Sequence, residues 1–244
     1  MDKSKSTLFW LTALAGMFAL GAASQGSGFI EDLFYYSGDV VYLIQQHLVL
    51  SAISGGLAIL IGLPLGIWLS RPQNRHIAEG AMQVLNIGTT VPTLALLALS
   101  MSLLGIGATP AVFALCIATL LPIVRNTYVG LLDVPAYLKE AANGMGMTAI
   151  QILFRVEIPN ALFVMFAGIR TALTINVGTV PLAFLIGGGG LGELIFTGIA
   201  LDEMPMLLAG AIPTALLAIL VDACVGGTAY ALVSKGVNPL RNSR

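Results

Sequence analysis

The sequence predicts an all-α fold, a polytopic transmembrane helix bundle with about six spans. Hydrophobic residues make up 57% of the 244 residues and charged residues only 9%, whereas soluble domains carry about 25% charged residues. The apolar stretches are also long enough to cross a membrane, because about 20 residues at 1.5 Å each cover ~30 Å of hydrocarbon. A soluble globular protein is therefore excluded. The predicted spans are residues 8–24, 48–69, 81–104, 108–124, 161–187 and 205–233.

The distribution of basic residues predicts the orientation of the bundle. If both termini are cytoplasmic, all eleven Lys and Arg residues fall on or near the inner side, as the positive-inside rule requires. The segments that would then lie outside, 25–46, 105–107 and 188–204, contain no Lys or Arg. Residues 1–24 also resemble a secretory signal, with two lysines before an apolar run. The charge pattern favours an uncleaved first helix.

The segment between the fourth and fifth predicted spans, residues 133–159, is the one long inner loop and is unusually polar. Asp133 is placed to cap a short helix with Pro135 in its first turn. Two glycines follow Asn143 at close spacing. Because glycine disfavours a continued helix, we expect this first helix to end at Asn143.

A second short helix is predicted in the same segment. Thr148 and Gln151 have the spacing of a capping box at its start. Pro159 disfavours helix at Ile158, so we expect the second helix to end there. Ordinary connections are a handful of residues, and long ordered ones are usually functional. We therefore interpret the segment as a docking hairpin of two angled helices rather than as a plain linker.

This hairpin contains a motif of fixed spacing. It reads Glu-Ala-Ala, three residues, Gly, nine residues, then Val-Glu-Ile-Pro. The pattern resembles the EAA loop of ATP-binding-cassette (ABC) importer permeases, which reads Glu-Ala-Ala, three residues, Gly, nine residues, Ile-x-Leu-Pro. The chain departs from that pattern only by Val for Ile and Ile for Leu. The matching positions are Glu140, Ala141, Ala142, Gly146, Val156, Ile158 and Pro159.

The resemblance covers residues 47–235 and implies a type I ABC importer permease core. Residues 1–46 would then form an N-terminal membrane helix and outer segment, and residues 236–244 a cytoplasmic tail. In that family the hairpin, here 133–159, docks into a cleft of a cytosolic ATPase subunit. The other implied partners are a second permease subunit (the same or a sister chain), a periplasmic or lipid-anchored solute-binding protein and membrane lipid, with no nucleic acid. The implied location is the bacterial inner membrane.

Three stretches, EAANGMGM, AGIRTA and GGGGLGELI, are most similar to the osmoprotectant branch of the family. Its solutes are glycine betaine, choline and carnitine. The methionine branch is a near relative, so another small solute such as an amino acid is the alternative. The family implies that ATP and Mg are used by the partner ATPase and that this chain binds no cofactor. None of its four lysines follows a glycine, and a P-loop requires a Gly-Lys-Ser/Thr triplet.

Residues 187–192 read Gly-Gly-Gly-Gly-Leu-Gly and contain a GxGxxG string. A dinucleotide site needs a preceding strand within a soluble βαβ unit, whereas an apolar helix precedes this string. We predict a tight outer-side turn in which missing side chains let helices approach. The family resemblance implies that Gly189 and Gly192 help to form an outer gate.

Two charged residues lie in or near the predicted spans. Arg170 is expected at the inner membrane edge, where it either anchors the helix by snorkelling or has a pairing or gating role. Asp222 lies within the last span, where a central Asp costs roughly 2.5–3.5 kcal/mol, so it should face the bundle interior. A structural bond to Ser or Thr is favoured for Asp222, and contact with a cationic solute is the alternative.

Two spans contain a proline preceded by polar residues. Proline leaves a backbone carbonyl without its helical partner, and such breaks are tolerated where they line a cavity or where neighbouring helices satisfy them. We interpret these positions as lining the translocation pathway. They are Thr89, Thr90 and Pro92 in the third span and Asn176, Thr179 and Pro181 in the fifth.

Two rival classes are less consistent with the sequence. A self-sufficient ion-coupled secondary transporter would use Asp222 as a proton or ion site, but it leaves the hairpin unexplained. A membrane enzyme would need a cluster of His, Asp and Glu residues. His47 and His76 are far apart and predicted on opposite sides, so neither a catalytic nor a metal site is expected.

Overall fold

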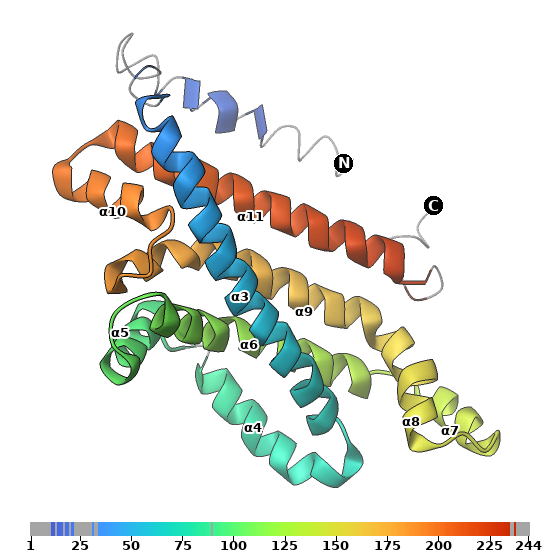
Figure 1. Cartoon of the computed structure of the whole chain (residues 1–244). Helices are drawn as coiled ribbons and strands as arrows, with labels where there is room; N and C mark the ends of the chain where they lie inside the picture. Colours follow the sequence, from blue (N-terminus) through green and yellow to red (C-terminus); the bar gives the residue numbers. More distant parts are fainter. Residues whose placement is uncertain are drawn as a thin grey trace.

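The computed structural model describes residues 34–88 and 90–234, with isolated positions at 11, 12, 14–16, 18, 19, 21, 31 and 237. Across these residues the chain is a bundle of helices without strands, which confirms the predicted all-α fold (Figure 1). The α-helices are α3 (Ser37–Leu69), α4 (Arg75–Gly88), α5 (Thr93–Leu104), α6 (Ala108–Leu132), α7 (Ala136–Gly144), α8 (Ala149–Ile152), α9 (Ile158–Thr179), α10 (Gly192–Leu201) and α11 (Met204–Leu232). Three shorter elements join them: the 3-10 helices η1 (Pro72–Asn74) and η3 (Val180–Ile186), and the π-helix η2 (Leu153–Glu157).

Four of the described helical segments are long and apolar enough to cross a membrane, and a bent pair brings the number to five. They correspond to five of the six predicted spans. The sixth, predicted at 8–24, lies largely outside the described residues. The four unbroken segments are Ser37–Leu69, Ala108–Leu132, Ala149–Ile186 and Met204–Leu232.

The span predicted at 81–104 is sharply bent near the proline that was expected to interrupt it. The helical segment Pro72–Gly88 and α5 meet at an angle of 100°. Pro92 caps α5 in an extended backbone conformation, with φ −59° and ψ 136°. A proline also disfavours helical backbone at the residue before it, so the helix cannot continue through this position.

Several helices are longer than their predicted spans. Helix α3 begins at Ser37 and runs without interruption across the expected boundary at 46/47. Residues 39–46 contain neither Gly nor Pro, so nothing in the sequence stops the helix there. Helix α6 continues past residue 124 to Leu132. The apolar length of a segment therefore gives the span, but not the full helix.

Helix α6 lies at the centre of the bundle and packs against α3, α5 and α9. Two glycines let α3 approach it closely. A Cβ atom at Gly62 would lie 2.9 Å from Ile123, and one at Gly66 would lie 2.6 Å from Thr127. Small residues at such crossings are typical of membrane helices, where van der Waals packing drives association.

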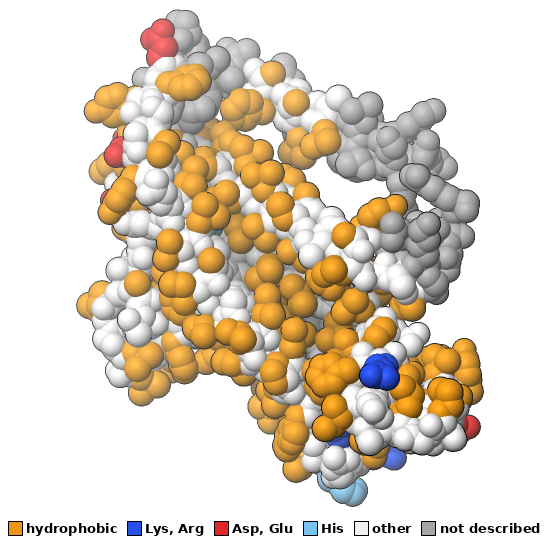
Figure 2. Space-filling view, turned by 45° about the vertical axis from the view of Figure 1, so that its right-hand side comes forward, with side chains coloured by type: hydrophobic (Ala, Val, Ile, Leu, Met, Phe, Trp, Pro, Cys, Tyr) orange, Lys and Arg blue, Asp and Glu red, His pale blue; other side chains and the backbone are white. Residues whose placement is uncertain are grey.

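The two ends of the bundle differ in character. At one end the turn before α6 meets the end of η3, where the backbone N–H of Gly107 donates to the carbonyl of Ile186 over 2.8 Å. At the other end α7 and α8 project from the bundle (Figure 1). Blue basic side chains gather toward this projecting end in the view of Figure 2, and most of the visible acidic ones lie toward the opposite end.

Candidate functional site: the EAA hairpin and the polar pairs of the bundle

The first helix of the hairpin, α7, starts later than predicted. Asp133 does not cap it; this residue closes the C-terminus of α6, where its N–H donates to the carbonyl of Val129 over 2.9 Å. Helix α7 begins after Pro135, whose backbone is extended and whose position has no side-chain cap. The expected Asp133 cap is wrong because α6 continues eight residues past its predicted end and takes Asp133 into its last turn.

Helix α7 ends in a Schellman motif built on Gly146. The N–H of Met147 donates to the carbonyl of Ala142 over 3.1 Å, and the N–H of Gly146 donates to Asn143 over 2.9 Å. Gly146 has φ +77°, the left-handed conformation that this motif requires and that glycine adopts without steric cost. The predicted break after Asn143 is confirmed to within one residue.

The second half of the hairpin starts as predicted but does not end as predicted. Thr148 and Gln151 form the expected capping box, with bonds of 2.9 and 3.4 Å. The helix then passes through the π-helix η2 into α9, so the predicted end at Ile158 is wrong. The N–H of Ile158 reaches back five residues to Leu153. This wider turn places Pro159 in the first turn of α9, where a proline is tolerated.

The surface of the hairpin is apolar at its projecting end. Met145, Ile150 and Phe154 are 74, 71 and 63% exposed. Orange side chains accordingly cover much of this projection in Figure 2. The motif residues divide by exposure. Glu140, Ala141, Gly146 and Pro159 are exposed, Val156 and Ile158 are half-buried, and Ala142 is buried.

A partly buried ion pair ties the hairpin to the bundle. Arg71, just after the end of α3, donates from Nη1 to the Glu157 carboxylate over 2.6 Å. Glu157 is buried within the π-helix. Beside this pair, buried apolar residues join the end of α6 to the start of α9. The hairpin and the bundle are therefore in firm contact. The apolar residues are Leu131, Val134, Ala161 and Met165.

The proline break at the far end of α9 is satisfied by a neighbouring helix. Pro181 has no N–H, so the carbonyl of Val177, four residues earlier, lacks its helical partner. The Nε2 atom of His47, on α3, lies 3.0 Å from that carbonyl and must donate to it. His47 is fully buried, and its Nδ1 atom has no partner among the described residues.

The glycine-rich turn after η3 packs directly on this break. Gly187, Gly189 and Gly190 all have positive φ, and a Cβ atom at Gly192 would lie 1.9 Å from the Pro181 carbonyl oxygen. The neighbour of His47 on α3, Gln46, accepts a bond from the N–H of Gly190 over 3.0 Å. The predicted tight turn is confirmed, and Pro181 and Gly192 are brought into contact.

The remaining polar residues near the breaks occupy different surroundings. Asn176 is buried, and its amide donates to hydroxyls of two other helices, Ser54 at 2.9 Å and Thr119 at 2.6 Å. Thr90 is exposed and donates to the carbonyl of Ile87 over 2.7 Å. Asn176 thus cross-links three helices inside this chain, and its predicted pathway role stays a prediction. Thr89 lies outside the described residues.

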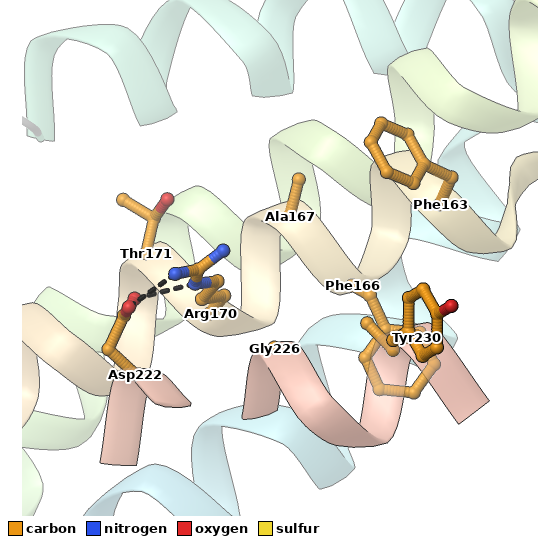
Figure 3. A pocket seen from close by; sticks show the side chains of 9 residues that line it. Phe163, Phe166, Ala167, Arg170, Thr171, Asp222, Gly226 and Tyr230 are labelled. Carbon is orange, nitrogen blue, oxygen red and sulfur yellow. Dashed lines mark hydrogen bonds and ion pairs between the residues drawn. The ribbon is translucent and has the colours of Figure 1, made fainter. Parts of the chain in front are cut away.

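Arg170 and Asp222 form an ion pair with each other, whereas the sequence predicted a pairing role for Arg170 without naming its partner. The Nε atom of Arg170 donates to Oδ1 of Asp222 over 2.6 Å, and Nη2 donates to Oδ2 (Figure 3). The Thr174 hydroxyl lies 3.4 Å from the same Oδ1. Of the readings offered for Arg170, the pairing role is the one observed. Asp222 is held by an Arg as well as by the expected hydroxyl.

A family model matches most of the chain. Residues 62–234 match the family described as binding-protein-dependent transport system inner membrane component. This chain belongs to that family. It is a multi-pass permease subunit of an ABC importer, and the fold and the EAA hairpin described above agree with that membership.

Several relatives of this permease carry names from osmoprotectant transport. The osmoprotectant import permease protein OsmY of Salmonella typhimurium is 58% identical over 193 residues, which is 79% of this chain and 82% of OsmY. The glycine betaine/carnitine/choline transport system permease protein OpuCD of Bacillus subtilis is 40% identical, over 81% of this chain and 87% of that one. An inward-facing structure of the MetNI methionine transporter has a TM-score of 0.72, covering 80% of this chain and 96% of that one. At 24% identity, this likeness shows the fold alone.

The permease also contains functional candidates that sequence reasoning missed. His47 forms a hydrogen bond with Val177 and Arg71 an ion pair with Glu157. No local sequence pattern predicts pairs so far apart along the chain. The Arg170–Asp222 pair did leave a signal. Each is the one charged residue of its predicted span, and charges within membrane helices are expected to pair with one another.

Proposed function

We propose that this permease imports osmoprotectants of the glycine betaine, choline and carnitine class. The names of several relatives that are 39–58% identical support this class. The pore would consist of two permease subunits, the same or a sister chain, supplied by a periplasmic or lipid-anchored binding protein. A separate cytosolic ATPase would use ATP and Mg, and this chain would bind neither. The complex would lie in a bacterial inner membrane with both termini of this chain in the cytoplasm.

The exposed apolar tip of the hairpin is the observation that carries the coupling part of the proposal. Met145, Ile150 and Phe154 stand on a projection that also holds charged residues and lies beyond the packed helices. Exposed apolar patches rimmed by polar residues mark protein interaction sites. Because the chain belongs to a family of ABC importer permeases, we propose a cytosolic ATPase subunit as the protein that binds this surface.

The connection from hairpin to bundle supports transmission of movement. Helix is continuous from Ala149 through η2, α9 and η3 to Ile186, a run of 38 residues. Its first turn belongs to the hairpin, and its last element, η3, carries Pro181 against the glycine-rich turn. Movement of the hairpin after ATP binding would therefore reach the region around Gly189 and Gly192, the proposed outer gate, through one element.

The proposed pathway residues lie where the bundle has breaks or charges. Pro92 and Thr90 stand at the 100° bend, and Pro181 stands at the start of η3. Changes of backbone angle concentrate at such points. Alternating access would use these two breaks as hinges, with the Arg170–Asp222 pair between α9 and α11.

Co-purification tests the proposed assembly directly. The tagged chain, extracted from the native membrane, is expected to bring an ATPase, a solute-binding protein and any sister permease, each identified by mass spectrometry. Phe154→Asp places a charge in the apolar tip and should remove the ATPase from the complex. Leu201→Asp, an equally exposed site at the opposite end, should retain it. Normal ATPase recovery with Phe154→Asp would contradict the docking role of the hairpin.

A further inference from the structure

A cavity between α9 and α11 combines charged and aromatic side chains. Its volume is about 350 Å³, and Figure 3 shows the Arg170–Asp222 pair at one end and aromatic rings toward the other. Small residues, among them Ala167 and Gly226, lie between these two ends and leave the space open. The rings belong to Phe163, Phe166 and Tyr230.

The charges in this cavity require surroundings other than lipid. The side chains of Arg170 and Asp222 are 47 and 36% exposed in the single chain, and both lie well inside helices that are long enough to span. A charged group facing hydrocarbon is expensive, so such residues face a water-filled cavity or a protein neighbour. The cavity is therefore expected to open to the transport pathway or to the second permease subunit.

The ion pair leaves one face of Arg170 available. Nε and Nη2 bind the carboxylate of Asp222, whereas Nη1 takes no part in that pair and points away from Asp222 in Figure 3. A Cβ atom at Gly226 would lie 3.5 Å from Nη1, so the glycine keeps space beside this nitrogen. An incoming carboxylate could accept a bond from Nη1 without breaking the Arg170–Asp222 pair.

We propose that this cavity binds the transported solute and takes a zwitterion with a methylated ammonium group at one end and a carboxylate at the other. Arg170 Nη1 binds the carboxylate, and the rings of Phe166, Tyr230 and Phe163 receive the ammonium, which aromatic faces attract. The proposal rests on the osmoprotectant function proposed above and makes it more specific. Asp222 fixes the guanidinium and cancels its charge.

This arrangement discriminates within the osmoprotectant class. Among the described lining residues only Arg170 and Asp222 are charged, and they neutralise each other. A pure cation such as choline finds rings but no free carboxylate, because Asp222 is already bound at both oxygens. Glycine betaine and carnitine satisfy both ends of the cavity. The cavity should therefore prefer them to choline.

Protection of introduced cysteines from alkylation measures this preference without a binding protein. The full complex in lipid nanodiscs carries Cys224→Ser, which removes the exposed native thiol, and either Ala167→Cys or Ala229→Cys. Using both helices ensures that one unreactive position does not decide the result. Millimolar glycine betaine is expected to slow alkylation about fivefold or more, whereas choline at the same concentration should slow it by less than about twofold.

Substitutions at each end of the cavity test the carboxylate site and the ammonium site separately. Arg170→Lys keeps the charge and can pair with Asp222 but loses the forked donors, so protection by glycine betaine should fall to the level of choline. Phe166→Leu or Tyr230→Leu should weaken protection by glycine betaine roughly three- to tenfold. Phe113→Leu, an exposed aromatic position on α6 outside the cavity, is the matched control and should change nothing.

Two failures are distinguishable. If wild-type complexes fed by their binding protein import none of the three compounds, the proposed function is wrong, whatever the protection shows. If they import glycine betaine but it gives no protection at either cysteine, or choline protects equally well, the cavity proposal is overturned. Unchanged protection in Arg170→Lys would overturn it as well.

Discussion

Gly146 and Gly192 are required for different physical reasons. Gly146 sits at φ +77° with no atom within 4 Å of where its Cβ would lie, so only backbone conformation restricts it. Gly192 has an ordinary backbone, but its missing Cβ is the space in which the Pro181 carbonyl lies. A side chain would strain the first position and collide at the second.

Replacing Gly146 by Leu should leave membrane insertion intact but impair function. The left-handed conformation costs a residue with a Cβ about 1–2 kcal/mol, and a leucine would also protrude from the proposed docking surface. We expect reduced retention of the ATPase or hydrolysis uncoupled from uptake, measured at matched membrane abundance.

Gly144→Leu is the matched control for that change. It lies two residues away in the same hairpin, has equally open space and lacks a positive φ. Its effect should be smaller. Glu140→Ala should also do less, because an exposed charge contributes under ~1 kcal/mol. Normal uptake and ATPase retention in Gly146→Leu would mean that the hairpin is only a linker.

Gly192→Ala should destabilise the permease itself. A methyl group 1.9 Å from the Pro181 oxygen cannot be accommodated without moving the turn or η3, and such overpacking costs typically 1–3 kcal/mol or more. The thermal midpoint of the purified complex should drop by several degrees. Gly178→Ala, within α9 and with no atom inside 4 Å, should not lower it, because alanine favours helix more than glycine does. Equal midpoints for the two variants would show that the turn is looser than described.

At the scale of the element, the long helix from Ala149 to Ile186 is maintained through two prolines by two devices. At Pro159 the π-helix widens the turn before the proline. At Pro181 the chain narrows into the 3-10 helix η3, and His47 satisfies the carbonyl left without a partner. The sequence therefore predicted the break at Pro181 correctly, whereas the helix end predicted before Pro159 is wrong.

The bond from His47 to Val177 predicts a specific double-mutant result. His47→Leu should destabilise the permease by about 1–3 kcal/mol, because it leaves a buried carbonyl unsatisfied. Pro181→Ala restores an N–H that can reach Val177. The same His47→Leu change should therefore cost less in the Pro181→Ala background. Thermal unfolding of the four proteins measures this coupling, and strictly additive effects would rule out the assigned bond.

Much of the hairpin structure is predictable from the sequence, and each wrong prediction has a local cause. The capping box and the glycine break depend on neighbouring residues, so Thr148, Gln151 and Gly146 were placed correctly. Asp133 was misassigned because the real end of α6 is set by packing, not by hydropathy. The end at Ile158 was misplaced because a π-helix leaves no pattern in the sequence.

At the scale of the whole molecule, pairing between distant segments was the part that sequence could not supply. The low charge content and the long apolar stretches predict the fold class and the span order. The contacts of Arg71 with Glu157, Arg170 with Asp222 and Gln46 with Gly190 join residues 52 to 144 positions apart. These distances along the chain exceed any helical or turn periodicity. Only Arg170 and Asp222, each the one charged residue of its predicted span, can be paired from the sequence; the other two contacts are revealed by the packed bundle.

The orientation of the molecule is testable with four single cysteines in a Cys224→Ser background. Asp39 and Glu193 are exposed toward the end of the glycine-rich turn, and Arg75 and Met145 are exposed toward the end of the hairpin. Impermeant thiol reagents applied to intact cells should label cysteines at 39 and 193 but not at 75 and 145. Because Arg75 is exposed and lies outside the proposed docking tip, absence of labelling at position 75 reports sidedness rather than burial under the ATPase. Labelling of a cysteine at 145 in intact cells would show that the hairpin faces outward, which contradicts the proposed orientation.

The central claim is that a partner ATPase, not an ion gradient, drives import through this permease. Accumulation of glycine betaine in proteoliposomes containing the full complex tests this most directly. ATP at the ATPase side, with binding protein outside and no ion gradient, should drive accumulation. Vesicles with this chain alone should accumulate nothing under any gradient. Accumulation by the chain alone under a proton or sodium gradient, abolished by Asp222→Asn, would contradict the account.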